Sequence, residues 1–557
     1  MSRSILKVFF LIICGISLCS YQKKNINDKP QENPRIVNII NFIRGVEPRI
    51  PAITDEVLYE TVVQQIKCLR QNHLKATFLI QYDALVNPKY QKLLKEAQKY
   101  GFEIGGWWEI TQPHVEAAGL KWRGKYSWDW HANVGFSTGY STEEREILVD
   151  VYMKKFKEIF GKYPSSVGSW FIDAHTLSYM YDKYHVIASC NCKDQIGTDG
   201  YTLWGGYWGQ GYYPSRKNAY MPAQTQKAQI PVPIFRMLGS DPIYQYDCGI
   251  GGEMQSVITL EPACSDGGGS PDWVRWFFKT MFSDPCINYT YTQAGQENSF
   301  TWDAMKNGYE MQMPMLAGLQ NQKKISIQTL SETGTWYKSK FSVTPSTAVS
   351  ALSDYKNRNR KTVWFDSRFY RTNLLWEGHS FLFRDIHLFN EDYASDYLSK
   401  AGTSTRCVYM TLPFVDGCLW STKNQLAGLR IYCTGNDGKM AEMKCDSTIV
   451  SSKGNTFRVI MNLDGKGVAF IILLKEKEIE VMCDAKNKNF IWDIELNKYS
   501  KANMPFVRIT DTFITAVQNN FVYHIRCKQG MFVDCRKESK ECIFKIKPQN
   551  QKVILMF

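Results

Sequence analysis

Three segments near the N-terminus decide the fold of this chain: VNIINFIRG (37–45), ATFLIQYDAL (76–85) and YGFEIGGWWEITQPH (100–114). Each contains a short apolar run of the kind found in strands that are buried on both faces. Between them lie two helical patterns, one that Thr54 can cap and one that begins with an Asn-Pro pair. Strands that alternate with helices in this way predict a parallel sheet with right-handed crossovers.

The same alternation continues through the following segments. Ser141 and Glu144 form a capping box for another helix, and Ser-Pro and Thr-Pro pairs at 270–271 and 344–345 predict further helix starts. The remaining strand candidates are SVGSWFI (166–172), HVIAS (185–189), PIFRML (233–238), residues 286–291 and ISIQTL (325–330). This length and strand number favour an α/β fold of the (β/α)7-8 barrel type over an open doubly wound sheet. No GxGxxG or P-loop motif follows a strand, which argues against a nucleotide-binding sheet.

The pattern changes near residue 399. Beyond it, short apolar runs such as FRVIMNL (457–463), GVAFIILL (467–474) and FVYHIRC (521–527) alternate with Asn, Asp and Gly turns. We therefore predict a barrel catalytic domain over residues 36–398 and an antiparallel β-sandwich over residues 399–557.

Residues 1–20 have the pattern of an export signal. Arg3 and Lys7 precede an apolar run, residues 8–18, that is too short to span a bilayer. Residues 21–35 are polar and predict a tether, and Cys19 is a candidate for lipidation that would attach the protein to a membrane. We expect an exported protein, periplasmic or held as an outer-membrane lipoprotein of a Gram-negative bacterium.

The composition is that of a globular protein, since 44% of the 557 residues are hydrophobic and 22% are charged. The formal net charge of +13 is spread along the chain without a Lys/Arg block, so we expect no nucleic-acid partner. Half of the 16 cysteines lie within residues 407–542, and in an exported protein some of them should form disulfides.

Residues 192–222, CKDQIGTDGYTLWGGYWGQGYYPSRKNAYMP, combine many glycines with many aromatic side chains. The glycines exclude a core helix or strand, and the aromatics exclude a solvated linker. An ordered loop of this kind can stack aromatic rings on a sugar. We predict that Trp204, Tyr207, Trp208 and Asp199 bind an oligo- or polysaccharide, the alternative being that the rings pack on the protein's own core.

Barrel enzymes place their reacting groups at the carboxyl ends of the strands. By this rule the candidate catalytic carboxylates are Glu109, Asp173, Asp241 and Glu297. Two carboxylates at one barrel mouth can cleave a glycoside, because one donates a proton to the leaving oxygen while the other attacks the anomeric carbon or activates water. For each carboxylate the alternative is a helix cap or a salt bridge. The further candidate substrate-binding residues at strand ends are Arg44, Trp107, Trp108, His114 and His175.

The histidines give no metal signature. The chain has 8 histidines, and none form an HxxxH or HExxH pair. We therefore assign no metal ligands and expect no cofactor.

The three opening segments resemble the glycoside hydrolase/deacetylase barrel superfamily, which includes NodB-type polysaccharide deacetylases. In those deacetylases the first strand ends in TFDDG and the third reads GHEIGxH before a second histidine. Here Ile43 and Arg44 stand in place of the two aspartates, Trp107 or Trp108 falls near the first histidine, and His114 corresponds to the second. The sequence is therefore more similar to the metal-free, carboxylate-based glycosidases of the superfamily.

This resemblance implies a catalytic pair made of Asp173 with Asp241 or Glu297. The favoured interpretation is an exported carbohydrate-active enzyme, a glycoside hydrolase that acts on an oligo- or polysaccharide. Two alternatives remain, a metal-dependent polysaccharide deacetylase with an altered triad and a glycan-binding protein without catalysis.

Overall fold

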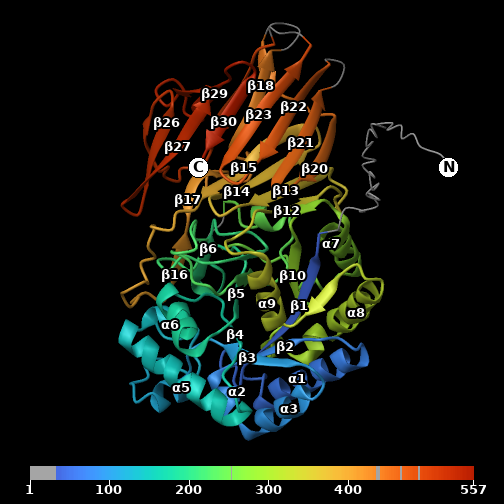
Figure 1. Ribbon diagram of the computed structural model, residues 1–557, viewed down its shortest axis with the longest axis vertical. Helices are drawn as coiled ribbons and strands as arrows, with labels where there is room; N and C mark the ends of the chain where they lie inside the picture. The colour runs from blue at the N-terminus through green and yellow to red at the C-terminus, as the bar shows by residue number, and fades with distance from the viewer. Residues whose placement is uncertain (1–32, 252–253, 435–438, 464–466, 487–489) are drawn as a thin grey trace, which may run out of the picture.

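The computed structural model describes residues 33–251, 254–434, 439–463, 467–486 and 490–557. A barrel-like sheet surrounded by helices forms one half of the molecule, and antiparallel sheets stand on one end of it (Figure 1). The predicted export signal, Cys19 and nearly all of the predicted tether lie outside the described residues. None of the helices that the structure describes has the length and hydrophobicity needed to cross a membrane.

One 9-stranded sheet forms the barrel, in the order β10-β1-β2-β3-β4-β5-β8-β7, with β11 also paired to β1. Its strands are β1 (Arg35–Ile43), β2 (Thr77–Ile80), β3 (Glu103–Trp107), β4 (Ser166–Gly168), β5 (Ala188–Asn191), β7 (Gly211–Tyr212), β8 (Ile234–Arg236), β10 (Thr290–Ala294) and β11 (Ser326–Gln328). All the pairs are parallel except β7 with β8.

The barrel is nearly closed. Among the described residues no strand ladder joins β8 to β10. At this seam the side-chain amide of Gln210 accepts a hydrogen bond from the Tyr291 N–H at 2.7 Å and donates one to the Tyr291 carbonyl at 3.3 Å. A side chain thus takes the place of a neighbouring strand.

Helices cover the outside of this sheet (Figure 1). They are α1 (Asp55–Gln71), α2 (Tyr82–Val86), α3 (Pro88–Gln98), α4 (Gln112–Ala117), α5 (Thr142–Phe160), α6 (Ala174–Tyr184), α7 (Pro271–Ser283), α8 (Trp302–Asn321) and α9 (Leu330–Lys340), with the short 3-10 helices η1 (Ser137–Gly139), η2 (Thr198–Gly200), η3 (Gln245–Asp247) and η4 (Asn298–Phe300). The predicted caps are confirmed, because the Thr54 side chain caps α1 and Ser141 with Glu144 forms a reciprocal capping box at α5.

Two large antiparallel sheets form the other half. The 11-stranded sheet has the order β28-β29-β24-β18-β15-β14-β13-β12-β9 with β17 and β19 at its side, and the 8-stranded sheet has the order β20-β21-β22-β23-β30-β27-β26-β25. The strands of the first are β9 (Cys286–Ile287), β12 (Thr347–Ala351), β13 (Arg360–Asp366), β14 (Tyr370–Glu377), β15 (Ser380–Leu388), β17 (Leu412–Asp416), β18 (Gly428–Thr434), β19 (Met440–Glu442), β24 (Trp492–Asn497), β28 (Met531–Asp534) and β29 (Cys542–Lys547). Those of the second are β20 (Ser447–Lys453), β21 (Thr456–Leu463), β22 (Val468–Leu474), β23 (Glu478–Ala485), β25 (Phe506–Ile509), β26 (Phe513–Gln518), β27 (Phe521–Gln529) and β30 (Lys552–Met556). Phe470 of β22 packs edge-on against Trp492 of β24 at 5.1 Å between ring centroids, so the two sheets share a core.

The antiparallel half begins earlier than the sequence indicated. Strands β12 to β15 lie before residue 399, yet they belong to the same sheet as β18 and β24. The Thr-Pro pair at 344–345, predicted to start a helix, instead leads into β12. The run of consecutive antiparallel strands therefore begins at Thr347, before residue 399, and the two-residue β9 joins the same sheet from within the barrel half.

Cysteines that the structure describes, among them Cys190, Cys407, Cys527 and Cys542, are not joined in disulfides, so the disulfides expected from the sequence are not formed by these residues. Most of them are buried, including Cys190 on β5 and Cys407 on β16 (Cys407–Met410), a strand that pairs in parallel with β6 (Tyr201–Trp204). Their desolvation favours the neutral thiol, and burial raises the pKa of Cys407 to about 12.

Candidate functional site

A cavity of about 490 Å³ lies at the mouth of the barrel. Its walls come from the segments that follow the carboxyl ends of β1, β3, β4, β5, β8 and β10. The charged residues of the lining are Arg44, Glu47, Arg49, Glu109, Asp199, Glu261 and Glu297. The aromatic residues are Trp128, Trp130, Phe136, Trp170, Tyr201 and Phe300. The strand-end rule thus brings Arg44, Glu109, Asp199 and Glu297 of the predicted site together.

Arg44 is the centre of the charged wall. Its Nε and Nη2 donate to the two oxygens of Glu109 at 3.0 and 2.8 Å, and its Nη1 lies 3.2 Å from Glu297 Oε2. Gln81 donates a further hydrogen bond to Glu109 at 2.8 Å. Burial opposes the charge of Arg44, but Glu109 and Glu297 outweigh burial and raise its pKa. Arg44 and Glu109 therefore form a fixed, two-pronged ion pair.

Glu297 is held less tightly than Glu109. Ser299 and Arg44 donate to its Oε1 at 2.8 and 3.3 Å, while its buried Oε2 lies in the ion pair with Arg44 but accepts no aligned hydrogen bond among the described residues. Burial, reinforced by the charge of Glu109, outweighs Arg44 and raises the pKa of Glu297 to about 7. A carboxyl group with this pKa can carry a proton near neutral pH.

A second arginine lines the entrance next to Arg44. Arg49 donates to Glu47 Oε2 at 2.6 Å, and both guanidinium groups lie over the Trp128 ring, at 4.1 Å for Arg44 and 4.9 Å for Arg49. Burial opposes the charge of Glu47, but Arg49 and Arg44 outweigh it and lower the pKa of this carboxyl. Two guanidinium groups thus face three carboxyl groups, of which the weakly held Glu297 is the one with a raised pKa.

The remaining carboxylates belong to other loops. Asp199 is exposed and has left-handed backbone angles, with φ 56°. Glu261 accepts hydrogen bonds from Thr259 at 2.7 Å and Gln296 at 2.9 Å, and burial raises its pKa. Asp199 is thus the lining carboxylate with the freest access to water.

Two of the predicted catalytic carboxylates lie elsewhere. Asp173 caps α6 and forms a fully buried ion pair with Arg145 at 3.0 Å. Asp241 accepts from the N–H groups of Ile243 and Tyr244 and from the Trp273 indole at 2.8 Å. Asp173 and Asp241 thus make the cap, ion-pair and hydrogen-bond contacts that were the alternative to catalysis, and neither lines the cavity.

Four of the predicted substrate-binding residues also lie away from the mouth cavity. Trp107 stacks on Phe42 at 4.1 Å inside the barrel, and Trp108 packs edge-on against His114 at 5.6 Å. His114 bonds the Leu148 carbonyl at 2.8 Å, and burial lowers its pKa to about 4. His175 pairs with Glu146 at 3.0 Å on the outer helices. Side chains near the strand ends of a barrel point both inward and outward, and those of Trp107, Trp108 and His114 fill core positions, whereas His175 is partly exposed on α6.

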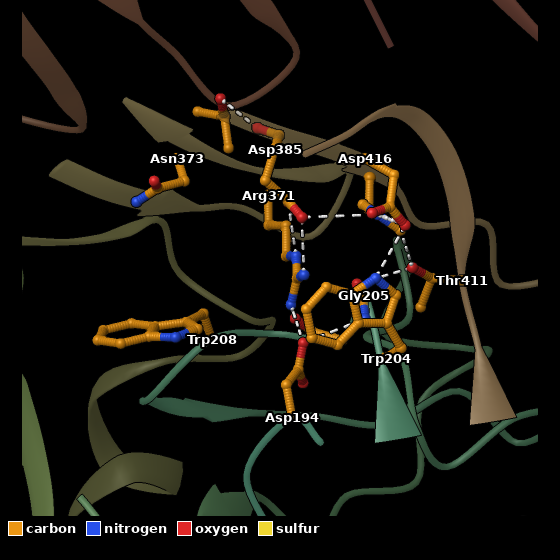
Figure 2. A network of polar contacts seen from close by, with 12 residues as sticks. Asp194, Trp204, Gly205, Trp208, Arg371, Asn373, Asp385, Thr411 and Asp416 are labelled. Atoms are coloured by element: carbon orange, nitrogen blue, oxygen red, sulfur yellow. Dashed lines mark hydrogen bonds and ion pairs between the residues drawn. The ribbon is translucent and has the colours of Figure 1, made fainter. Parts of the chain in front are cut away.

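The aromatic loop binds the antiparallel sheet rather than the mouth cavity. Trp208 stacks on Trp364 of β13 at 4.7 Å, Trp204 donates to Asp416 of β17 at 2.9 Å, and the Tyr207 hydroxyl donates to the Pro345 carbonyl at 2.8 Å. Trp204 and Trp208 lie on opposite sides of a polar network in Figure 2. The rings therefore pack on the protein's own core, the alternative left open by the sequence.

A second buried arginine is the centre of that network (Figure 2). Arg371 of β14 donates to both oxygens of Asp385 at 2.8 and 2.9 Å and forms an ion pair with Asp194. Asp194 also accepts from Arg236 at 2.9 Å and from the Tyr220 hydroxyl. Burial opposes the charge of Asp194, but Arg371 and Arg236 outweigh it and lower its pKa. The network joins the barrel to the sheets.

Several residues that line the mouth cavity were not predicted from the sequence. Trp128 and Trp130 belong to SWDWH (127–131), whose aromatic density could have marked them. Glu47 and Arg49 follow Arg44 in the same loop. Glu261 lies far along the chain from β8, in a loop that gave no signal.

The mouth does not fit a divalent metal ion. The carboxylates of Glu109 and Glu297 converge on the guanidinium of Arg44, which already supplies the positive charge. Within the described part of the chain, no three His, Cys, Asp or Glu side chains come together as a metal site.

No family model matches the chain, and no curated protein matches it. Among solved structures, a protein of Parabacteroides distasonis described as a glycoside hydrolase/deacetylase is 14% identical with a TM-score of 0.51, covering 71% of this chain and 94% of its own. A 4-alpha-glucanotransferase of Thermococcus litoralis is 8% identical with a TM-score of 0.33, covering 94% of this chain and 99% of its own. A family 4 acetyl xylan esterase of Clostridium thermocellum is 9% identical with a TM-score of 0.25, covering 55% and 92%. The first likeness shows the fold, a mixed α/β protein with a nearly closed barrel-like sheet.

Proposed function

We propose that this chain is a carbohydrate-active enzyme that hydrolyses glycosidic bonds in the cavity at the barrel mouth. The observation that carries this proposal is Glu297, a carboxyl group with a pKa of about 7 that lines a cavity walled by aromatic rings. An acid that is protonated near neutral pH is what the departure of a sugar alcohol requires.

In the proposed reaction Glu297 gives its proton to the glycosidic oxygen as the bond from that oxygen to the anomeric carbon breaks. Asp199, the exposed carboxylate of the lining, takes a proton from the water that adds to the anomeric carbon. Arg44 holds Glu109 in a bidentate ion pair beside Glu297, and burial together with the charge of Glu109 raises the pKa of Glu297, so that Glu297 can hold the proton that it transfers. Arg44 and Glu109 are thus positioning residues, and Glu297 and Asp199 are the proposed catalytic pair.

The description of the Parabacteroides distasonis protein names both glycoside hydrolase and deacetylase. We favour the glycosidase because the carboxylates of this mouth are paired with a guanidinium instead of facing a metal ion. The resemblance of the sequence to the metal-free glycosidases is a second reason for this choice. Export remains a proposal from residues 1–20, which the structure does not describe.

The test is product analysis on a panel of neutral, acetylated and acidic polysaccharides. We expect new reducing ends without release of acetate, and we expect Glu297→Gln to remove them. Glu116→Gln, on the exposed face of α4, is the matched control and should keep full activity. Release of acetate without chain cleavage would replace the proposal by the deacetylase. Tight binding without any cleavage would replace it by the glycan-binding protein.

A further inference from the structure

A second, much smaller cavity lies at the seam of the barrel between β8 and β10. It is lined by Arg236 and Met237 from the β8 side, by Thr292 of β10, by Phe277 of α7 and by the segment Lys193–Asp194. Its volume is about 20 Å³, enough for one water molecule or one monoatomic ion and too small for a phosphate or a sugar.

Buried hydrogen-bond donors without partners surround this cavity. Arg236 is 2% exposed, and its Nη2 donates to Asp194 at 2.9 Å and to the Tyr220 hydroxyl at 3.0 Å. Its Nε and Nη1 have no hydrogen-bond partner among the described residues. The Tyr212 hydroxyl lies near this guanidinium and donates to the Ala219 carbonyl at 2.7 Å. Two nitrogens of this buried cation, which carry three N–H bonds between them, are therefore available to a ligand in the cavity that Arg236 lines.

Thr292 adds a third unpaired group. Its hydroxyl is buried and has no partner among the described residues. Gly239, which also lines the cavity, leaves room there, because a Cβ at this position would lie 3.0 Å from the Thr292 hydroxyl. The hydroxyl can turn its proton toward any acceptor that occupies this space.

The charges around the cavity favour an anion over a water molecule. Lys193 is 3% exposed, and its Nζ donates to the Asp194 carbonyl at 3.2 Å. The side chain of Asp194 is shared between Arg236 and Arg371. Arginine and lysine offer donors alone, whereas a water molecule would turn its own protons toward some of them. Burial lowers the pKa of Lys193, and a bound anion would favour its charged form.

We propose that this cavity binds a halide ion, with chloride as the natural ligand. The ion accepts hydrogen bonds from Arg236 and Thr292 and ties β8 to β10 where the strand ladder is missing. Lys193, which also lines this cavity, precedes the mouth residues Gln195 and Asp199 in the chain. This role is independent of the reaction proposed for the mouth.

The test is thermal unfolding of the full chain in sodium gluconate, with gluconate replaced by chloride at constant ionic strength. A saturable rise in Tm is expected, because a ligand that binds the native state alone stabilises it. Crystals soaked in bromide should show an anomalous peak beside Arg236. An equal Tm in both salts, with no bromide peak, would assign a water molecule to the cavity and overturn the proposal.

A matched pair of variants locates the effect. Thr292→Val removes one donor without changing the volume and should raise the half-saturating chloride concentration about tenfold, the scale of a lost hydrogen bond to a charged group. Thr280→Val removes another buried, unpaired hydroxyl that does not line the cavity, so it should leave the chloride response unchanged. Equal responses of the two variants would place the chloride elsewhere and also overturn the proposal.

Discussion

Two buried arginines organise this molecule, and their surroundings differ. Arg44 binds Glu109 and Glu297 at the edge of the mouth cavity, whereas Arg371 binds Asp194 and Asp385 in the network between the barrel and the sheets (Figure 2). Arg371 pairs with these two carboxylates, and Arg44 pairs with its two and, at 3.7 Å, with Glu47 as well. At the mouth, one carboxyl group has a raised pKa and an oxygen without a donor, while in the network the pKa of Asp194 is lowered. A buried arginine between carboxyl groups can therefore accompany a carboxyl group with a raised pKa that serves as a proton donor, or it can hold two parts of a fold together.

The largest expected difference concerns stability. Arg371→Met leaves Asp194 and Asp385 buried without their shared cation, and we expect a loss of about 3–5 kcal/mol in the free energy of unfolding. Arg44→Met should cost less than half of that, because Glu297 can take up a proton and the cavity admits water. Urea denaturation of both variants measures the two values. Equal losses would show that the mouth is as much a structural ion-pair site as the network.

Turnover measurements should distinguish the carboxyl group at the mouth, Glu297, from the buried carboxylate in the core, Asp173. Glu297→Gln should lower kcat on a cleaved glycan by about 10²-fold or more, the range of a lost general acid, with little change in Tm. Asp173→Asn should do the reverse, because Asp173 caps α6 and pairs with Arg145 in the core. Initial rates and thermal unfolding of both variants test this. If Asp173→Asn alone abolished turnover at unchanged Tm, the catalytic assignment made from the sequence would be restored.

Local sequence signals predicted the strands and caps well, and they failed where distant contacts decide. The capping box at Ser141 depends on residues three apart, so the sequence contains all of it. Arg44, Glu109 and Glu297 were found because strand ends of a barrel meet at one mouth. Trp204 and Trp208 pack against β17 and β13, which follow them by many residues. The local sequence of the loop does not predict that these distant strands will cover it.

The same reason explains the other differences. Asp173 is both a strand-end carboxylate and a helix cap, and only its fully buried partner Arg145 distinguishes the two roles. A Thr-Pro pair begins helices, but it also suits the extended chain that leads into β12. Glu261 is separated from β8 by a long loop, so the expectation that functional residues follow strand ends directly does not identify it.

The pH dependence follows from Glu297. Its pKa of about 7 means that the proton donor is lost as the pH rises, so kcat/KM should fall about tenfold per pH unit above pH 7. The native state also keeps a proton that an ordinary glutamate releases near pH 4.5, so this group makes the free energy of unfolding fall as the pH rises from about 4.5 to about 7. Comparison of wild type with Glu297→Gln across this range measures the slope that Glu297 contributes. Parallel stability curves for the two proteins would contradict the raised pKa.

The smallest expected effect is a change in KM, and it distinguishes an aromatic residue of the mouth cavity from one in the network between the barrel and the sheets. Phe300 lines the mouth cavity three residues after Glu297 and is 44% exposed, whereas Trp204 is 1% exposed in the network. A ring that is exposed beside an acid can stack on a sugar, and its loss removes about 1 kcal/mol of binding, or roughly a fivefold rise in KM. Phe300→Ala should therefore raise KM at nearly unchanged Tm. Trp204→Ala should lower Tm by many degrees, because it empties a packed site and leaves Asp416 without its indole donor. If Trp204→Ala instead weakened glycan binding at an unchanged Tm, the aromatic loop would be the sugar platform that its sequence suggested, and the network would not be a structural core.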